Sequence, residues 1–243
     1  MSNNYTWNIS LPKKRVLIDQ PLFLGDIIFV MAIAQKYANE GHIVDFPLEN
    51  EYYDIPIQKY FPNPNINYMR MEDFSEYKNY DNMIYIEDDK YIYLPLSESW
   101  RRVRFQQMGN KYTFIGLPIK MWRDVKIIRD YKRENKLFNK LGLIDGDKYN
   151  LINEHYRKAL IKVPISVNNG YKNIFMKKID DYSLFDWIGV MQRAQSIHTI
   201  GTSILFIMDL IENMPADMHV YKRNDGKLHD VYDYLYIKKY IYH

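Results

Sequence analysis

The 243-residue chain contains no cysteine, which excludes a disulfide framework and a zinc site built from thiolates. It also lacks any run of the roughly 20 apolar residues that a membrane-spanning helix needs. The polar segment from Met1 to Pro12 has no apolar core of the kind that defines a signal peptide. Together these absences predict a cytoplasmic protein, although contact with a membrane surface through basic side chains stays open.

Two sequence motifs of nucleotide-binding proteins are also missing. No Gly-x-Gly-x-x-Gly segment occurs among the 10 glycines, which disfavours a dinucleotide-dependent oxidoreductase. No P-loop occurs either, so a kinase or phosphatase is poorly supported. A nucleotide ligand would therefore have to be held by a different arrangement of backbone and side chains.

The chain is rich in tyrosine, with 23 residues beside 11 Phe and 4 Trp. This bias fits an AT-rich genome as well as any function, because a tyrosine ring packs like phenylalanine while its hydroxyl reaches water or a partner. The net charge of +3 permits a polyanionic partner but is too small for a dedicated nucleic-acid binder. With 47% hydrophobic residues, the chain is expected to fold as one large or two small α/β domains.

The first half of the chain has the pattern of a βαβ unit. Residues 15–19 form a short apolar run suited to a buried strand, and apolar residues then recur at helical spacing over 26–37. Gly41 is a stop signal for that helix, and residues 42–46 follow as a second strand. Further strands of the same sheet are expected at 66–69, 83–86 and 91–96.

The second half repeats this architecture after a charged, helical stretch over 98–141 that we interpret as a connector. Strands are expected at 149–153, 173–176, 196–200 and 218–221, and helices at 186–194, 203–211 and 232–242. We therefore predict an α/β fold of two Rossmann-like domains facing a cleft. The predicted boundaries are 1–110 for the first domain, 111–148 for the helical connector, 149–228 for the second domain, and 229–243 for a C-terminal helix that packs back on the first.

The first candidate site is the turn from Leu22 to Asp26, which joins the first strand to its helix. It lies at the carboxyl edge of the predicted sheet, where open α/β sheets bind ligands. Gly25 allows a close backbone approach, and Asp26 is predicted at the helix N-cap. Aspartate is also among the best N-caps, so the turn could serve the helix alone.

The second candidate site is the segment from Ile197 to Ser203. Gly201, Thr202 and Ser203 bring backbone N–H groups and two hydroxyls to the start of a helix, which favours a bound phosphate. His198 could add a proton or a hydrogen bond to the same group. The alternative is that the hydroxyls only cap the helix and the histidine is structural.

The third candidate site follows the strands of the second half. Polar residues from Asn153 to Arg157, including His155, crowd the end of one strand. Basic residues follow the ends of two others and could offset diphosphate charge, namely Lys177, Lys178, Lys222 and Arg223. Arg101 and Arg104 could contact an anionic acceptor. For each of these charges, a solvated surface position is the simpler interpretation.

With these residues placed, the chain resembles glycosyltransferases of the GT-B architecture. Val16 to Ile18 followed by Leu24 to Ile28 looks like the start of a heptosyltransferase-like protein, in which a Gly-Asp turn carries the general base. Asp186-Trp187, Ala194 and the segment from Ile197 to Ser203 resemble the donor half, where a histidine and a Thr-Ser pair contact the phosphates of the nucleotide sugar. The chain lacks the Asp-x-Gly that such proteins place before the donor-side helix.

The resemblance implies an enzyme that moves a sugar from a nucleoside diphosphate sugar to an acceptor hydroxyl. The first domain would bind the acceptor through Gly25, Arg101 and Arg104, with Asp26 as the catalytic base. The donor would be bound by residues of the second half, namely His155, Lys178, His198, Thr202, Ser203 and Arg223. We expect no cofactor and a mechanism that needs no divalent metal.

The acceptor is left open by the sequence. A viral or phage setting would fit the composition and would make a hydroxymethylated DNA base a candidate, whereas a glycan or lipid-linked sugar is the other candidate. A catalytically silent nucleotide-binding or assembly protein with the same two-lobed fold is the alternative to an enzyme. It would bind a nucleotide at Thr202 and Ser203 and be indifferent to Asp26.

Overall fold

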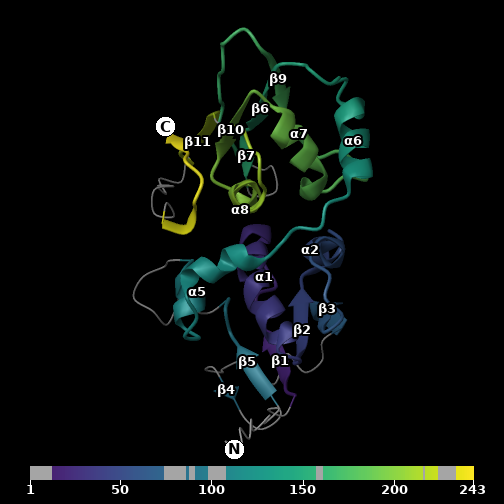
Figure 1. Cartoon of the computed structure of the whole chain (residues 1–243), viewed down its shortest axis with the longest axis vertical. Coiled ribbons are helices and arrows are strands. Elements are labelled where there is room, and N and C mark those ends of the chain that lie inside the picture. The colour runs from purple at the N-terminus through teal and green to yellow at the C-terminus, as the bar shows by residue number, and fades with distance from the viewer. Residues whose placement is uncertain are drawn as a thin grey trace, which may run out of the picture.

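The computed structural model describes residues 13–73, 86–87, 91–97, 108–156, 161–215, 217–223 and 234–243. This part of the chain contains two five-stranded sheets, one in each half, and a small two-stranded sheet. In Figure 1 the first half lies below and the second half above, with α1 and α8 between the two sheets. The expectation of an α/β protein with two Rossmann-like halves is confirmed.

The first sheet has the strand order β3-β2-β1-β5-β4. Its strands pair in parallel except β4, which runs antiparallel to β5 at the edge. The apolar residues of β1, Val16 to Ile18, are buried, as expected for a central strand of a parallel sheet. The strands are β1 (Arg15–Ile18), β2 (Ile43–Leu48), β3 (Ile66–Arg70), β4 (Ile86–Glu87) and β5 (Tyr91–Leu94). Of the strand expected at 83–86, residues 83–85 lie outside the described residues.

The helix α1 (Leu24–Asn39) is the main helix of the first half. It is buried along most of its length, which the run of Ile, Val, Met and Phe after Asp26 explains. Shorter helical segments follow the second and third strands: α2 (Asn50–Tyr53), α3 (Ile57–Tyr60) and the 3-10 turn η1 (Met71–Asp73).

The second sheet has the strand order β12-β11-β10-β6-β9, and every pair in it is parallel. The first strand in chain order is β6. The next strand, β9, lies on one side of it, and β10, β11 and β12 (Ile241–Tyr242) follow on the other side. This is the 2-1-3-4-5 order of doubly wound folds, in which ligands bind where the order reverses. The bounds are β6 (Tyr149–Asn153), β9 (Lys172–Phe175), β10 (Ser196–Ile200) and β11 (Asp217–Tyr221), with η4 (Leu184–Trp187), α7 (Ile188–Arg193) and α8 (Ser203–Leu210) as helices.

The connector is helical only in part. It contains α5 (Asn110–Thr113), the 3-10 segment η3 (Ile119–Asp124) and α6 (Tyr131–Lys140), while residues 125–130 are not helical. Gly116, at φ +73°, and Pro118 interrupt the helical pattern between the first two segments. In its described residues, 108–141, the connector therefore consists of short helical segments rather than one continuous helix.

The predicted C-terminal helix is wrong for the described residues 234–243. The chain there ends in β12 (Ile241–Tyr242), which pairs in parallel with β11. Before β12, the segment contacts the connector, since Trp122 Nε1 donates to the carbonyl of Leu235 at 2.9 Å. Pairing with the sheet edge satisfies backbone groups of β11 that would otherwise face solvent, which outweighs the helical spacing of the apolar residues.

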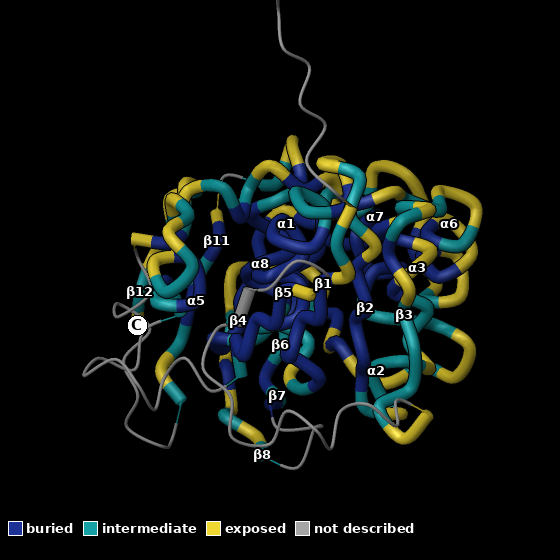
Figure 2. The backbone as a smooth tube through the Cα atoms, turned by 90° about the horizontal axis from the view of Figure 1, so that it is seen from below, coloured by how far each residue is buried: buried dark blue, intermediate teal, exposed yellow. Residues whose placement is uncertain are grey.

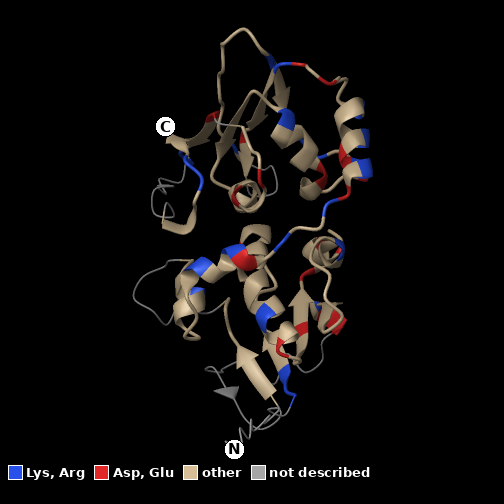
Figure 3. Ribbon diagram, viewed as in Figure 1, with Lys and Arg blue, Asp and Glu red and all other residues tan. Residues whose placement is uncertain are grey.

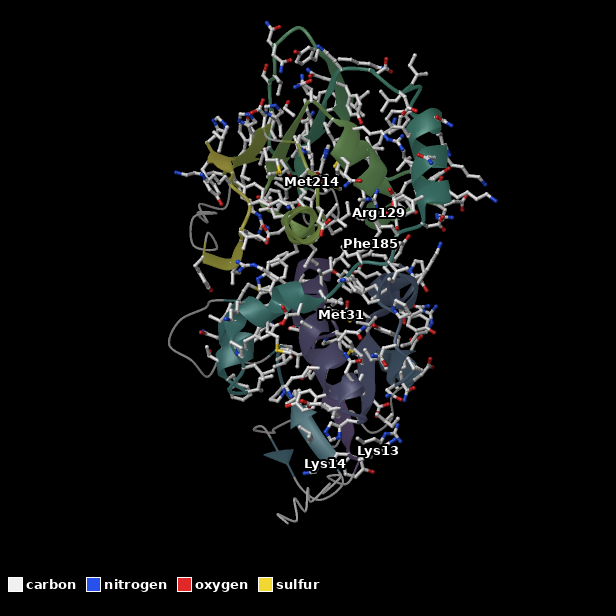
Figure 4. All side chains as sticks on the ribbon, in the orientation of Figure 1. Lys13, Lys14, Met31, Arg129, Phe185 and Met214 are labelled. Carbon is white, nitrogen blue, oxygen red and sulfur yellow. The ribbon has the colours of Figure 1, made fainter. Side chains whose placement is uncertain are left out.

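The two halves meet through aromatic side chains. Tyr60 of α3 stacks on Phe185 of η4, with ring centroids 4.2 Å apart, and Phe206 of α8 packs on Phe29 of α1 and on Trp122. Figure 4 places Phe185 and Arg129 at this junction. Figure 2 shows the central strands and α1 as mostly buried. Most buried hydrophobic residues of both halves belong to one cluster, so the halves share a core. A smaller cluster around Ile152 and Ile200 lies in the second half.

The charged residues are interspersed over both halves. Figure 3 shows basic and acidic residues next to one another along α6 and the segment that leads into it. No helix of the described residues is both long enough and apolar enough to span a bilayer.

Candidate functional site

The first part of the site lies where the order of the first sheet reverses, between β1 and β5. Asp19 and Gln20 follow β1, and both are buried. The backbone of Asp19 joins the two strand ends, because its N–H donates to the Leu94 carbonyl at 3.0 Å and its carbonyl accepts from Ser97 at 2.8 Å. Tyr93 donates its hydroxyl proton to Asp19 at 3.0 Å. The edge is therefore polar and rigidly hydrogen-bonded.

The turn after β1 begins α1 two residues earlier than predicted. Phe23 is the N-cap, with φ 62° and ψ 105°, and it makes no side-chain capping bond. Asp26 is therefore not the N-cap, which corrects the sequence-based expectation. It is the third residue of the helix, where its negative charge still interacts favourably with the helix dipole. A phenylalanine at positive φ is strained, and such positions are common in functional turns.

The carboxylate of Asp26 faces the ammonium of Lys111, at 3.3 Å from Oδ1 to Nζ. Burial raises the pKa of Asp26 above its ordinary value, and the nearby Lys111 charge opposes that shift. Burial likewise lowers the pKa of Lys111, opposed by Asp26. The side chain of Asp26 keeps 27% of its surface exposed, so a ligand can reach it. A partly exposed carboxylate with a raised pKa suits a general base.

Gly25 lies directly against the second half. A Cβ atom at this position would stand 3.1 Å from the ring of Phe206 and 3.4 Å from the Cα of Ser203. The absence of a side chain is therefore what lets the start of α1 approach the start of α8. This contact brings the first candidate site, at Asp26, beside the second, at Thr202 and Ser203.

The second part of the site lies where the order of the second sheet reverses, between β6 and β10. Asn153, at the end of β6, donates from Nδ2 to Thr199 Oγ1 at 2.9 Å and to Thr202 Oγ1 at 3.2 Å. Thr202 is the N-cap of α8, yet its hydroxyl makes no capping bond to the helix. Thr202 and Ser203 are both half-buried. The Thr202 hydroxyl therefore lies at the start of α8, and helix starts of this kind can bind anions.

Arg223 follows β11 and lies at the same edge of the second sheet. Its Nε donates to the carbonyl of Gly201 at 2.6 Å, and its guanidinium lies 5.2 Å from the ring centre of Tyr156. The guanidinium is thereby held beside the turn that carries Thr202. A positive charge fixed next to a helix N-terminus adds to the attraction for a phosphate group.

His198 is held inside the second sheet by its neighbours. Its ring nitrogens lie 2.9 Å from Ser196 Oγ and 3.1 Å from the Tyr221 hydroxyl, and its ring stacks on His219 with centroids 4.3 Å apart. Burial and the charges of His219 and His243 lower the pKa of His198 to about 4. These contacts engage both nitrogens, so the geometry favours a structural histidine over a phosphate contact.

The remaining predicted residues belong to neighbouring elements or lie outside the described part. His155 belongs to the hairpin of β7 (His155–Tyr156) and β8 (Ile161–Lys162) that follows β6. Lys178 is exposed beyond the end of β9. Arg101 and Arg104, like Arg157, lie outside the described residues. The structure thus joins Gly25, Asp26, Thr202, Ser203 and Arg223, and does not bring His198 to them.

One Asp-x-Asp triplet does occur in the chain, at Asp145 to Asp147, and the expectation of a metal-independent mechanism overlooked it. The triplet lies before β6, at the amino end of the second sheet and therefore away from the site edge. Asp145 is 92% exposed, and Asp147 accepts a hydrogen bond from the backbone N–H of Ile144 at 2.9 Å. The triplet is part of a turn between α6 and β6. Among the described residues, no group of three or more acidic or histidine side chains is placed to hold a metal ion.

Two residues of the site were missed by sequence reasoning. Lys111 and Gln20 hydrogen-bond to each other at 2.5 Å beside Asp26, although 91 positions separate them in the chain. Neither belongs to a recognisable motif. The available signal was a lysine next to the buried Tyr112, which a single sequence does not distinguish from a surface charge.

Two Rossmann-like halves that meet at the carboxyl edges of their sheets define the GT-B fold. No family model matches the chain, and no curated protein matches its sequence. Among solved structures, it is similar to a glycosyl transferase family 9 protein from Veillonella parvula DSM 2008, with a TM-score of 0.53 and 12% identity over 97% of this chain and 87% of that one. It is also similar to the ADP-heptose lps heptosyltransferase II of E. coli, with a TM-score of 0.51 and 10% identity over 95% of this chain and 92% of that one. At these identities the likeness is one of fold, and it spans both halves.

Proposed function

We propose that this protein is a glycosyltransferase that moves a sugar from a nucleoside diphosphate sugar to an acceptor hydroxyl. The observation that carries the proposal is the contact between Gly25 and the start of α8. A Cβ atom added at Gly25 would stand 3.4 Å from the Cα of Ser203. This contact sets a carboxylate suited to general-base catalysis beside a helix start suited to a diphosphate. The two solved structures of the same fold are glycosyltransferases by their names.

The proposed step uses the two halves together. Asp26 accepts the proton of the acceptor hydroxyl. The hydroxyl oxygen bonds to the anomeric carbon of the sugar, and the bond from that carbon to the diphosphate breaks. Thr202, Ser203 and Arg223 stabilise the negative charge that grows on the departing diphosphate. Lys178 and His155 are proposed as outer donor contacts. The positive charge of Arg223 and the N-terminus of α8 would stabilise the diphosphate charge, as a divalent metal does in other enzymes.

The acceptor enters from the side of the first half, near Gly25, with Arg101 and Arg104 as proposed contacts. A hydroxymethylated DNA base in a viral or phage setting and a glycan are the two candidate acceptors. Steep loss of activity with added salt would favour DNA, because phosphate contacts release counterions. Activity indifferent to salt would favour a glycan.

Thermal unfolding with a panel of UDP-, GDP-, ADP- and CMP-sugars tests donor binding, since a ligand of the folded state raises the melting temperature. We expect a shift with one nucleotide sugar that is lost in Thr202→Val/Ser203→Ala. Thr113→Val, at an exposed threonine of α5, is the matched control and should keep the shift. No shift with any nucleotide sugar would contradict the proposal. A shift without sugar transfer would favour the non-catalytic nucleotide-binding protein.

A further inference from the structure

Lys111 is a buried lysine at the carboxyl edge of the first sheet. It comes from α5 of the connector, and only 6% of its surface is exposed. A lysine is rarely buried to this extent unless its charge is paired and hydrogen-bonded. Figure 1 shows α5 alongside α1, the helix that carries Asp26. The burial of Lys111 therefore needs a specific explanation, because this lysine is not a solvated surface charge.

The ammonium of Lys111 has one acceptor for each of its three N–H groups. It donates to Gln20 Oε1 at 2.5 Å and to the Leu96 carbonyl at 2.9 Å, and it pairs with Asp26 Oδ1 at 3.3 Å. These acceptors follow β1, follow β5 and lie in the first turn of α1. A single charged group thus fixes the three segments that meet at this edge.

Burial is the largest influence on the pKa of Asp26, and Lys111 is the charged group that opposes it. Asp19, at the end of β1, acts on Lys111 and is itself bonded to the Tyr93 hydroxyl at 3.0 Å. From α8, the neighbours of the turn are Phe206 and Ser203, which carry no charge. Among the described residues, the charge that acts on Asp26 is that of Lys111.

We propose that Lys111 is a positioning residue for Asp26: its ammonium fixes one carboxylate oxygen and keeps the partly buried carboxylate ionised, ready to accept the proton of the acceptor hydroxyl. This inference rests on the proposed function of Asp26 as the base. Lys111 itself stays protonated throughout the step. Gln20 and the Leu96 carbonyl hold the ammonium in place, so that its charge cannot turn away from Asp26.

Loss of the charge should leave Asp26 harder to ionise. In Lys111→Met, we expect the acidic limb of the kcat/KM profile to move up by about one pH unit, which lowers activity about tenfold below that limb and restores it at higher pH. Lys111→Arg, which keeps the charge, should restore the profile in part. Lys120→Met, at an exposed lysine of η3, is the matched control and should keep the wild-type profile.

The carboxyl carbon of Asp26, followed by NMR in the free protein and assigned by comparison with Asp26→Asn, gives a readout that needs no substrate. We expect its pKa to be higher in Lys111→Met than in the wild type and in Lys120→Met. Lys111→Gln, which keeps a donor for Gln20 and Leu96, replaces Lys111→Met if that variant does not fold. An unchanged Asp26 pKa, or a loss of kcat/KM by the same factor at every pH, would overturn the inference. A raised pKa in a protein whose wild type transfers no sugar would uphold the pairing and reject the proposed function.

Discussion

Gly25 of the first half lies against Phe206 of the second, so closely that a Cβ atom at position 25 would stand 3.1 Å from the phenyl ring. The site therefore depends on a missing side chain as much as on the groups that are present. α1 and α8 each begin at the carboxyl edge of a sheet, and they meet at this glycine. The carboxylate of Asp26 and the hydroxyl of Thr202 are thereby held on neighbouring helix starts.

Gly25→Ala should destabilise the protein by about 1–3 kcal/mol, because the added methyl group overpacks the contact with Phe206. Urea unfolding of the single variants and of Gly25→Ala in a Phe206→Leu background measures the coupling. The cost of the alanine should be smaller in the leucine background. Equal costs in the two backgrounds would show that the contact does not limit position 25.

Asp186→Ala should cost about 2–4 kcal/mol of unfolding free energy. The fully buried carboxylate accepts from Arg133 Nε at 3.0 Å and from the backbone N–H of Ser183 at 2.8 Å, so its loss leaves both donors unpaired. Asp145→Ala, at an aspartate 92% exposed, is the control and should change stability by less than about 0.5 kcal/mol. Similar losses in the two variants would contradict a structural role for Asp186.

His198 should make the protein less stable in mild acid. Its pKa in the folded protein is about 4, below that of an unfolded histidine, so the unfolded chain binds the proton more readily and stability falls as the pH drops from about 6.5 towards 4. His198→Gln removes this titration. Its melting temperature should lie below the wild-type value at pH 8, and the two curves should converge towards pH 4. Parallel curves across this range would be the contrary result.

Arg223→Ala should weaken donor binding about tenfold if the guanidinium contributes to the phosphate site. Its hydrogen bond to Gly201 fixes the charge beside Thr202. Calorimetric titration with the nucleotide sugar found in the thermal panel measures the change. Lys222→Ala, at the exposed neighbouring lysine, should bind as the wild type does. Equal weakening in both variants would indicate a general effect of positive charge.

Much of the fold follows from short-range patterns. The strands β1 and β10 are runs of apolar residues bounded by polar turns, and α1 and α8 show helical spacing, with Gly25 in the first turn of α1 and Gly201 just before α8. In a doubly wound sheet, the loops after such strands form the ligand edge, so the sequence could place Asp26 and Thr202 at the starts of these two helices. Local pattern and topology agree there, which is why the prediction was possible.

Other features depend on contacts between distant segments. The tyrosine-rich C-terminus has the spacing of a helix, yet Ile241 and Tyr242 join the sheet because β11 offers an unpaired edge. Lys111 is buried because Gln20, Asp26 and Leu96 converge on it from three segments. His198 was predicted to contact phosphate, but its strand neighbours Ser196 and Tyr221 hold the ring. A single sequence does not contain these pairings in readable form.

Release of nucleoside diphosphate from the stabilising nucleotide sugar, measured for the wild type and Asp26→Asn with DNA and glycan acceptors, tests the proposed function most directly. The amide keeps the size of the side chain but cannot accept the proton. We expect turnover by the wild type, a loss of at least about a hundredfold in Asp26→Asn, and unchanged donor binding in that variant. A fully active Asp26→Asn would contradict the assignment of Asp26 as the base, and a wild type that binds the donor without turnover would contradict the transferase itself.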